Sequence, residues 1–192
     1  MAYTDWDTLR ADVAQCTKCD LCRTRHHTVF GEGFLPSDIM FIGEGPGQVE
    51  DETGRPFVGP AGKVFDELLD GIGLSRNDVY IANVLKCRPP GNRDPRPEEI
   101  AACMPYVRAQ TAFVKPKIIV GLGRYGSSLV LQRNVQMARE HGKVHEVGNF
   151  KIIPTYHPAA LLYNPNTMAA AEADFQVIRE QYDALRNDQG SE

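Results

Sequence analysis

The strongest constraint on the fold is the alternation of short β-rich apolar runs with longer stretches of helical spacing. Such alternation is typical of a largely parallel sheet with helices on both faces. We therefore predict an α/β fold, a three-layer α/β/α sandwich around a four-stranded, mainly parallel sheet. The predicted strands are Ile39–Gly43, Val79–Leu85, Ile118–Leu122 and Lys151–Tyr156. The predicted helices are Trp6–Ala14, Pro60–Ile72, Pro97–Phe113, Arg124–Leu131 and Ala169–Leu185.

The length of 192 residues suffices for one core, and the chain shows no internal repeat or linker. We expect a single domain over residues 1–186 and a flexible tail at 187–192. The apolar runs are too short to span a bilayer and the first residues do not resemble a signal peptide, so we expect a cytoplasmic protein with no membrane partner. The net charge of −4 disfavours a nucleic-acid partner only weakly, because local patches decide binding.

Polar side chains occur where three of the predicted strands end. Glu44 lies in the glycine-rich turn Gly43–Gly47, Asn83 lies near the end of the second strand, and His157 follows the fourth. Ligands of an open parallel sheet bind outside the carboxyl ends of its strands, so we expect these side chains to converge on an active site. The turn lacks the glycine pattern of a nucleotide-binding loop. Taken singly, Asn83 could cap a turn and His157 could be a core histidine.

Five cysteines occur in a chain that we expect to be cytoplasmic, where disulfides are rare. Cys16 and Cys19 can bind a metal or cluster from a single turn, and Cys87 and Cys103 can complete a four-thiolate site. We predict these four as ligands, whereas Cys22 is either a spare thiol or a replacement for one of the first pair. The spacing leaves zinc and a [4Fe–4S] cluster open. Unrelated buried cysteines are the alternative.

Five motifs share their order and spacing with one known family. They are Phe30–Gly33, Gly43–Gly47, Gly54–Gly59, Asn83–Arg93 and Pro154–Ala159. Together with the cysteine spacing, they make the chain resemble the thermophile-type, family 4 uracil-DNA glycosylases over most of residues 16–165. The resemblance implies a repair enzyme that removes uracil from single- and double-stranded DNA and leaves an abasic sugar. It also implies a [4Fe–4S] cluster in place of zinc.

The resemblance implies a pocket for a base that has left the DNA stack. Phe57 would stack on uracil, and the amide of Asn83 would accept from N3–H and donate to O4. Cytosine mispairs with this amide, at a cost of about 1–3 kcal/mol for each unsatisfied group. By the same resemblance, Glu50 would block the methyl group of thymine. The alternatives are a core aromatic for Phe57 and an exposed acidic loop residue for Glu50.

Cleavage of the glycosidic bond leaves uracil as an anion and the sugar as an oxocarbenium-like cation, and the protein must stabilise both. His157, placed at uracil O2, would stabilise the anion by donating a hydrogen bond from a neutral ring. Glu44 and the backbone around Gly45 would hold the attacking water. Glu44 is a base, an electrostatic partner of the cation or a loop anchor. The family usually has alanine at the position of Gly45, so the glycine leaves open a wider range of deaminated bases, such as hypoxanthine.

Cations and apolar residues near these motifs are the predicted DNA contacts. The predicted phosphate contacts are Lys86, Arg88, Asn92 and Arg93. They would make binding salt-dependent, and a solvated surface run is the alternative. Leu161 and Leu162 would wedge into the gap that the flipped nucleotide leaves, or else they begin a buried helix.

Two functions from other classes compete with the enzyme. One is a nucleic-acid-binding module with a structural metal, which predicts DNA binding without base release. The other is a redox sensor in which the cluster is the working part. We favour the enzyme, because a pure binder does not need Phe57, Asn83 and His157 at converging strand ends. We expect a monomer that acts at the nucleoid, and replication or repair proteins are further partners that the sequence leaves open.

Overall fold

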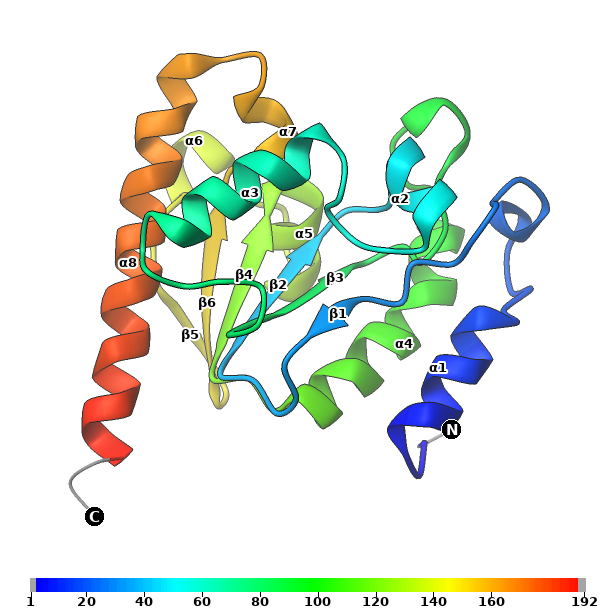
Figure 1. The fold of residues 1–192 in the computed structure, drawn as a ribbon, viewed down its shortest axis with the longest axis horizontal. Coiled ribbons are helices and arrows are strands. Elements are labelled where there is room, and N and C mark those ends of the chain that lie inside the picture. The colour runs from blue at the N-terminus through cyan, green and yellow to red at the C-terminus, as the bar shows by residue number, and fades with distance from the viewer. Residues whose placement is uncertain (1–2, 190–192) are drawn as a thin grey trace.

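Six strands form one sheet in the computed structural model, which describes residues 3–189. They are β1 (Glu32–Gly33), β2 (Ile39–Gly43), β3 (Tyr80–Asn83), β4 (Ile118–Leu122), β5 (His145–Val147) and β6 (Phe150–Thr155). Their order across the sheet is β1-β3-β2-β4-β6-β5 (Figure 1). The central strands β3, β2, β4 and β6 are parallel, and the edge strands β1 and β5 are antiparallel to their neighbours.

Helices cover both faces of this sheet, as the alternation of elements predicts. The helices are α1 (Trp6–Ala14), α2 (Gln48–Thr53), α3 (Pro60–Asp70), α4 (Pro97–Val114), α5 (Gly123–Val130), α6 (Met137–Glu140), α7 (Pro158–Leu161) and α8 (Pro165–Gln189). Ile39 and Phe41 of β2 pack toward α3 and α8, whereas Met40 and Ile42 pack toward α4 and α5. Successive side chains of a strand point to opposite faces, so a strand covered on both sides is apolar at every position. This explains the unbroken apolar runs of β2 and β4, whose residues are all buried.

The number of strands is where the prediction of a four-stranded sheet is wrong. The four parallel strands are present, but each edge of the sheet carries a further antiparallel strand of only two or three residues. Such short strands contain too few residues to show an alternating pattern. A signal for β5 existed nonetheless, since Val147 pairs with Phe150 across the two-residue turn Gly148–Asn149. Gly148 has a φ of 58°, and a Gly-Asn pair is typical of a β-hairpin.

The predicted helices and strands otherwise match the structure closely. Ile39–Gly43, Ile118–Leu122 and Trp6–Ala14 are confirmed residue for residue as β2, β4 and α1. The last helix, α8, is longer than predicted at both ends and continues to Gln189, inside the predicted tail. Residues 190–192 of that tail lie outside the described residues, and the division into one domain and a tail stays a prediction. Among the described helices, none is both long and apolar enough to cross a membrane.

The topology gathers the ends of the parallel strands at one edge of the sheet. β2 is the first of these strands along the chain, and its neighbours are β3 on one side and β4 on the other. The chain that leaves β2 leads to β3 on one side, whereas the chain that leaves β4 leads to β6 on the other. The two connections therefore diverge between β2 and β4, which creates the crevice where open α/β sheets bind ligands. Two short 3-10 turns, Asp20–Arg23 and Pro90–Asn92, flank this region in the segments that contain the cysteines and cations.

Candidate active site

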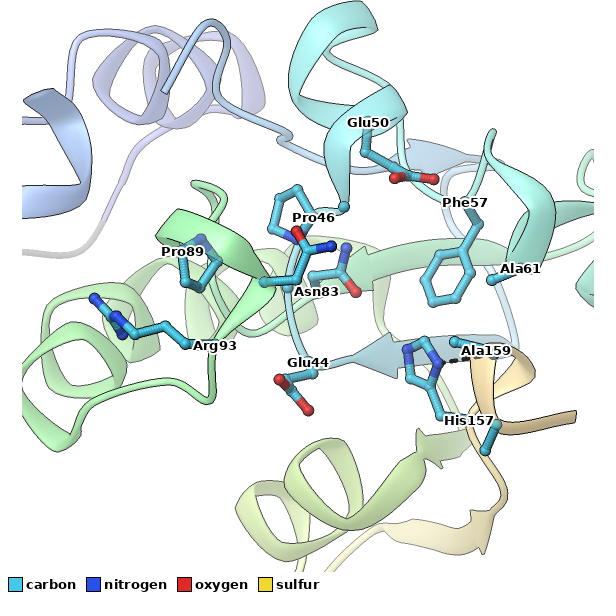
Figure 2. A pocket seen from close by; sticks show the side chains of 14 residues that line it. Glu44, Pro46, Glu50, Phe57, Ala61, Asn83, Pro89, Arg93, His157 and Ala159 are labelled. Atoms are coloured by element: carbon cyan, nitrogen blue, oxygen red, sulfur yellow. Dashed lines mark hydrogen bonds between the residues drawn. The ribbon is translucent and has the colours of Figure 1, made fainter. Parts of the chain in front are cut away.

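A cavity of about 380 Å³ lies beyond the carboxyl ends of β2, β3 and β6 (Figure 2). Its lining includes eight residues that the sequence predicts for the site, namely Glu44, Gly45, Glu50, Phe57, Asn83, Asn92, Arg93 and His157. The other lining residues are Pro46, Gly47, Ala61, Pro89, Ala159 and Ala160, for which the sequence predicted no individual role. The volume is in the range of small-molecule sites. A cavity therefore lies where the sequence predicts it, beyond the carboxyl ends of the parallel strands. Figure 2 shows Phe57, Asn83 and His157 projecting into it from three separate elements.

Asn83, the last residue of β3, places an unsatisfied acceptor in the wall of the cavity. Its side-chain Oδ1 is buried and has no hydrogen-bond partner among the described residues. Leaving a buried polar group unpaired is costly, so an orphan of this kind points to a ligand that completes it. Gly43 lies opposite in the sheet, and a Cβ atom there would be 2.3 Å from this Oδ1 and 2.8 Å from Cζ of Phe57. Only glycine at position 43 leaves room for both side chains.

Phe57 forms an aromatic wall between the core and the cavity. Its ring centroid is 5.3 Å from that of Phe65 in the core and 5.5 Å from that of His157 at the cavity. The two alternatives for Phe57 are therefore compatible, because one ring packs in the core and lines the site. The backbone of Phe57 has a φ of 51°, in the left-handed region that bulky residues rarely adopt.

His157 caps the N-terminus of α7 and keeps a neutral ring. Its Nδ1 accepts a hydrogen bond from the backbone N–H of Ala159 at 3.2 Å. A neutral ring whose Nδ1 is an acceptor carries its proton on Nε2, which makes Nε2 a donor. Burial lowers the pKa of His157 to about 4, and the nearby Glu50 opposes this shift only partly. Around neutral pH the site therefore contains a neutral imidazole with one N–H group to donate.

Glu44 follows β2 directly and lies half-buried at the cavity. Burial raises the pKa of its carboxyl group, Asp94 adds to the rise and Arg124 opposes it. Within the described part of the chain, this carboxylate has no hydrogen-bond partner, whereas the backbone carbonyl of Glu44 accepts from the N–H of Leu85 at 3.0 Å. The geometry therefore disfavours the loop-anchor interpretation, since the side chain anchors nothing.

Glu50 lies on α2, a six-residue helix that the sequence analysis did not predict. Its Oε1 accepts from the backbone N–H groups of Val58 at 3.0 Å and Gly59 at 2.9 Å. The interpretation as an exposed acidic loop residue is therefore wrong. The carboxylate is buried at the cavity and fixes the loop that carries Phe57.

Two of the predicted DNA contacts are wrong, because their side chains are buried. Lys86 is 1% exposed, and its Nζ donates to the backbone carbonyls of Asn83 at 2.7 Å and Phe30 at 3.3 Å. Burial also lowers the pKa of this ammonium to about 7. Leu161 is 3% exposed and packs in the core, which confirms the alternative of a buried helix for this residue. By contrast, Leu162 is 43% exposed at the end of α7, and Tyr163 beside it is also exposed.

The other predicted phosphate contacts lie at the rim of the cavity. Asn92 and Arg93 line it, and Nε of Arg88 donates to Oδ1 of Asn92 at 2.7 Å. Arg93 also donates to both oxygens of the buried Glu99, at 2.9 and 2.5 Å. This bidentate pair fixes the guanidinium of Arg93 and offsets part of its charge.

The four predicted ligand thiols lie within electrostatic reach of one another. Burial raises the pKa of Cys87 to about 11, and Cys103 and Cys19 contribute to the rise. The pKa of Cys103 is raised by burial, with contributions from Cys19 and Cys16. Cys22 adds to the raised pKa of Cys19, so it also lies nearby. Among the described residues, no three His, Cys, Asp or Glu side chains are grouped so as to hold a single metal ion.

Polar and charged residues also follow the end of β4, where no site residue was predicted from the sequence. Arg124 follows the end of β4, pairs with Asp94 at 3.6 Å and acts electrostatically on Glu44. The hydroxyl of Tyr125 donates to Asp94 at 2.7 Å. Charged residues directly after a predicted strand were the signal that could have indicated this group.

Comparison with known proteins identifies the class to which this fold and cavity belong. Residues 30–183 match the family described as the Uracil DNA glycosylase superfamily, and the chain belongs to that superfamily. It is 45% identical to the type-4 uracil-DNA glycosylase of Sulfurisphaera tokodaii, over 91% of this chain and 83% of the relative. It is 48% identical to the type-4 enzyme of Thermotoga maritima, over 79% of this chain and 80% of that relative. Within the superfamily, the chain is a member of the type-4, or family 4, uracil-DNA glycosylases.

A solved structure supports the fold at greater distance. The crystal structure of SMUG2 from Pedobacter heparinus superposes with a TM-score of 0.51 at 15% sequence identity. The match covers 79% of this chain and 76% of that one. At this identity the likeness shows the fold alone.

Proposed function

We propose that this protein is a uracil-DNA glycosylase that hydrolyses the N-glycosidic bond of uracil in DNA and leaves an abasic site. The observation that carries the proposal is the buried, unpaired Oδ1 of Asn83 in a cavity of about 380 Å³, which has room for a flipped base. The N3–H of uracil is the missing donor, and the amide nitrogen of Asn83 can donate to O4. Cytosine has an acceptor at N3, so it leaves Oδ1 unpaired, at a cost of about 1–3 kcal/mol.

The target nucleotide leaves the DNA stack before it reaches this cavity. The flipped base stacks on Phe57, whose far side rests on Phe65 and is therefore rigid. Glu50 is held by two backbone N–H groups, so its carboxylate cannot withdraw when a thymine methyl approaches. Stacking, amide pairing and this fixed wall together select uracil.

Bond cleavage moves the bonding electron pair from C1′ of the sugar to N1 of uracil, and the charge spreads to O2 and O4. The Nε2–H of His157 donates a hydrogen bond to O2 as this charge develops. The pKa of about 4 for His157 means that the ring needs no proton exchange for this role. Water adds its oxygen to C1′ and releases a proton. Glu44, with no competing hydrogen bond in the described residues, is placed to orient that water and to stabilise the cationic sugar.

The DNA strand passes along the rim of the cavity in this proposal. Arg88, Asn92 and Arg93 contact phosphates on either side of the flipped nucleotide, and the resulting affinity falls as salt rises. Leu162, exposed at the end of α7, fills the gap in the stack. Replication or repair partners, a monomeric state and a cytoplasmic location at the nucleoid stay predictions.

We further propose that Cys16, Cys19, Cys87 and Cys103 hold a [4Fe–4S] cluster. Each thiolate of such a cluster binds a different iron atom, so its ligands lie farther apart than four ligands of one zinc ion. The thiols here act electrostatically on one another, so they are near enough to share one centre. The similarity to the type-4 enzymes favours a cluster over zinc. A guanidinium N–H of Arg25 donates to Sγ of Cys87 at 3.3 Å and offsets thiolate charge. The cluster would tie the segment after α1 to α4, which is a structural role.

Metal analysis of protein purified without oxygen tests the cluster. We expect iron and acid-labile sulfide in equal amounts, with a broad visible absorption band. The variant Cys22→Ala should retain both, whereas Cys87→Ala should lose them. Stoichiometric zinc in place of iron would contradict the proposal.

Base release from defined oligonucleotides tests the enzymatic activity. The protein is incubated with matched strands that carry one uracil or one thymine, and alkali then cuts any abasic site. Cleavage at uracil alone is the expected result. A protein that binds these strands and contains iron, yet releases no base, would instead support the rival of a DNA-binding module.

A further inference from the structure

Arg76 lies outside the cavity but contacts the backbone of the residue that forms its aromatic wall. Nη1 of Arg76 donates to the carbonyl oxygen of Pro56 at 3.0 Å, and Nη2 donates to the carbonyl oxygen of Phe57. The arginine is in the loop between α3 and β3, and it does not line the cavity. One guanidinium group thus binds two consecutive carbonyls directly behind the uracil-stacking ring.

These carbonyls belong to a backbone segment that needs support. Phe57 has a φ of 51°, and a bulky residue in this conformation is strained and persists only where its surroundings hold it. On its other side the segment packs against the first turn of α3, where a Cβ atom at Gly62 would lie 1.8 Å from the carbonyl oxygen of Phe57. The carbonyl therefore lies between the glycine of α3 and the guanidinium of Arg76.

The guanidinium is itself fixed by acidic residues on two other elements. Nε donates to Oδ1 of Asp66 on α3 at 2.6 Å, and Nη1 donates to Oε1 of Glu32 on β1 at 3.0 Å. The side chain of Arg76 is only 21% exposed, so solvent competes little for these bonds. A planar fork of N–H donors can satisfy four acceptors at once, whereas a lysine ammonium cannot reproduce this geometry.

We propose that Arg76 is a positioning residue for the base: it holds the Phe57 backbone in its left-handed conformation and thereby sets the plane on which uracil stacks. This inference rests on the proposed glycosylase function. Asp66 and Glu32 orient the guanidinium, and through it α3 and β1 define the position of the ring. Arg76 touches neither the base nor the reacting atoms.

Arg55 offers a matched control on the same acidic residue. It donates to Glu32 through Nε at 2.9 Å and Nη2 at 3.2 Å, but its side chain is 63% exposed. Its side-chain hydrogen bonds within the described residues go to Glu32 alone. Arg55→Gln therefore removes an ion pair of Glu32 and leaves the contacts to the Phe57 backbone in place.

The experiment compares the wild type, Arg55→Gln and Arg76→Lys below the melting temperature of all three. Arg76→Lys keeps the positive charge between Asp66 and Glu32 but loses the forked donation. We expect it to slow single-turnover uracil release by about 10–100-fold, because small misplacements near a reacting group have effects of this order. We also expect weaker inhibition by free uracil, unchanged affinity for abasic DNA, and faster amide hydrogen exchange in residues 54–62. Arg55→Gln should match the wild type in all four measurements.

A purely structural role for Arg76 predicts a different result. Arg76→Lys would then melt at a lower temperature but match Arg55→Gln in rate, uracil inhibition and exchange, and this outcome would overturn the inference. If Arg76→Lys does not fold, Asp66→Asn removes one of the acceptors that orient the same guanidinium. It should then change the rate, the uracil inhibition and the hydrogen exchange in the same directions, but by less. Failure of the wild type to release uracil would contradict the proposed function instead, and the exchange of residues 54–62 would still decide whether Arg76 holds this segment.

Discussion

The backbone of Asn83 is supported by Lys86, for which the sequence predicted a different role. The backbone carbonyl of Asn83 accepts from Nζ of Lys86, a lysine with a buried side chain three positions further along the chain. The sequence shows that Lys86 is a lysine but not that its side chain is buried. Lys86 was therefore predicted to contact phosphates together with the other cations of its motif. Burial, which only the folded chain reveals, shows that this cation is not a DNA contact but supports the backbone of Asn83.

The dependence of activity on pH follows from two residues with shifts in opposite directions. Burial lowers the pKa of His157 to about 4 and raises the pKa of Glu44 above its ordinary value. As the pH falls, Glu44 therefore takes up a proton before His157 does. If the charge of Glu44 stabilises the sugar cation, the acid limb of kcat/KM belongs to Glu44. We expect kcat/KM of Glu44→Gln to be lower than that of the wild type and independent of pH between about pH 5 and 7. We expect kcat/KM of His157→Gln to be lower as well, but still to fall as the pH becomes acidic.

A profile of kcat/KM against pH for the three proteins checks this assignment. Circular dichroism at each pH serves as the control for folding. A Glu44→Gln variant with the acid limb of the wild type would show that another group is responsible.

Gly45 can accept the alanine that the family usually has at this position. A Cβ atom there would lie 3.4 Å from Cβ of Leu85, an ordinary contact distance, and Gly45 is not in the left-handed region. Gly→Ala at a compatible position stabilises a protein by about 0.4–1 kcal/mol through the unfolded chain. We therefore expect Gly45→Ala to raise the melting temperature and to leave uracil release nearly unchanged. Release of hypoxanthine by the wild type but not by Gly45→Ala would show that backbone freedom at Gly45 widens the base range. A misfolded Gly45→Ala variant would contradict the steric argument.

At the scale of elements, the sequence predicts what is long and buried and misses what is short. The runs that became β2 and β4 are buried on both faces, so their apolar character is continuous and easy to recognise. The edge strands β1 and β5 and the helix α2 are too short for a periodic pattern. Missing α2 had a consequence for the site, because the short acidic run around Glu50 then looked like an exposed loop.

The short helix α7 separates two adjacent leucines into different roles. Leu161 faces the core, whereas Leu162 is exposed beside the cavity. Filling a gap in stacked DNA is useful only where a stack exists, so Leu162→Ala should slow uracil release from double-stranded DNA more than from single-stranded DNA. We expect the slowing on double-stranded DNA to exceed that on single-stranded DNA by about tenfold, which corresponds to the loss of roughly 1–2 kcal/mol of apolar contact. The control Leu161→Ala should lose about 2–5 kcal/mol of folding stability instead.

Rates on matched single and double strands distinguish these outcomes. An equal loss on both substrates after Leu162→Ala would rule out a gap-filling role and indicate a general contact near the cavity.

At the scale of the whole molecule, the ordered motifs predicted the family and the cavity together. Strand ends that converge in space are separated widely in sequence, and the topology of a parallel sheet is what makes their meeting predictable. Arg76 was beyond sequence reasoning for a different reason. Its guanidinium binds backbone carbonyls. Every residue has a backbone carbonyl, so the sequence does not show which of them Arg76 binds. The net charge of −4 was equally uninformative, because a single cation at a site, such as Arg93 at the cavity, hardly changes the charge of the whole chain.

The most direct test of the central claim, that this cavity reads and releases uracil through Asn83, is single-turnover base release by the wild type, Asn83→Ala and Asn134→Ala. Asn134 is an exposed loop residue outside the cavity, so its variant controls for the loss of an asparagine amide. We predict that the wild type and Asn134→Ala release uracil at the same rate. A folded Asn83→Ala variant should be slower by at least about tenfold, since each buried polar group of uracil left without its partner costs about 1–3 kcal/mol. Release of uracil by folded Asn83→Ala at the wild-type rate would contradict the account.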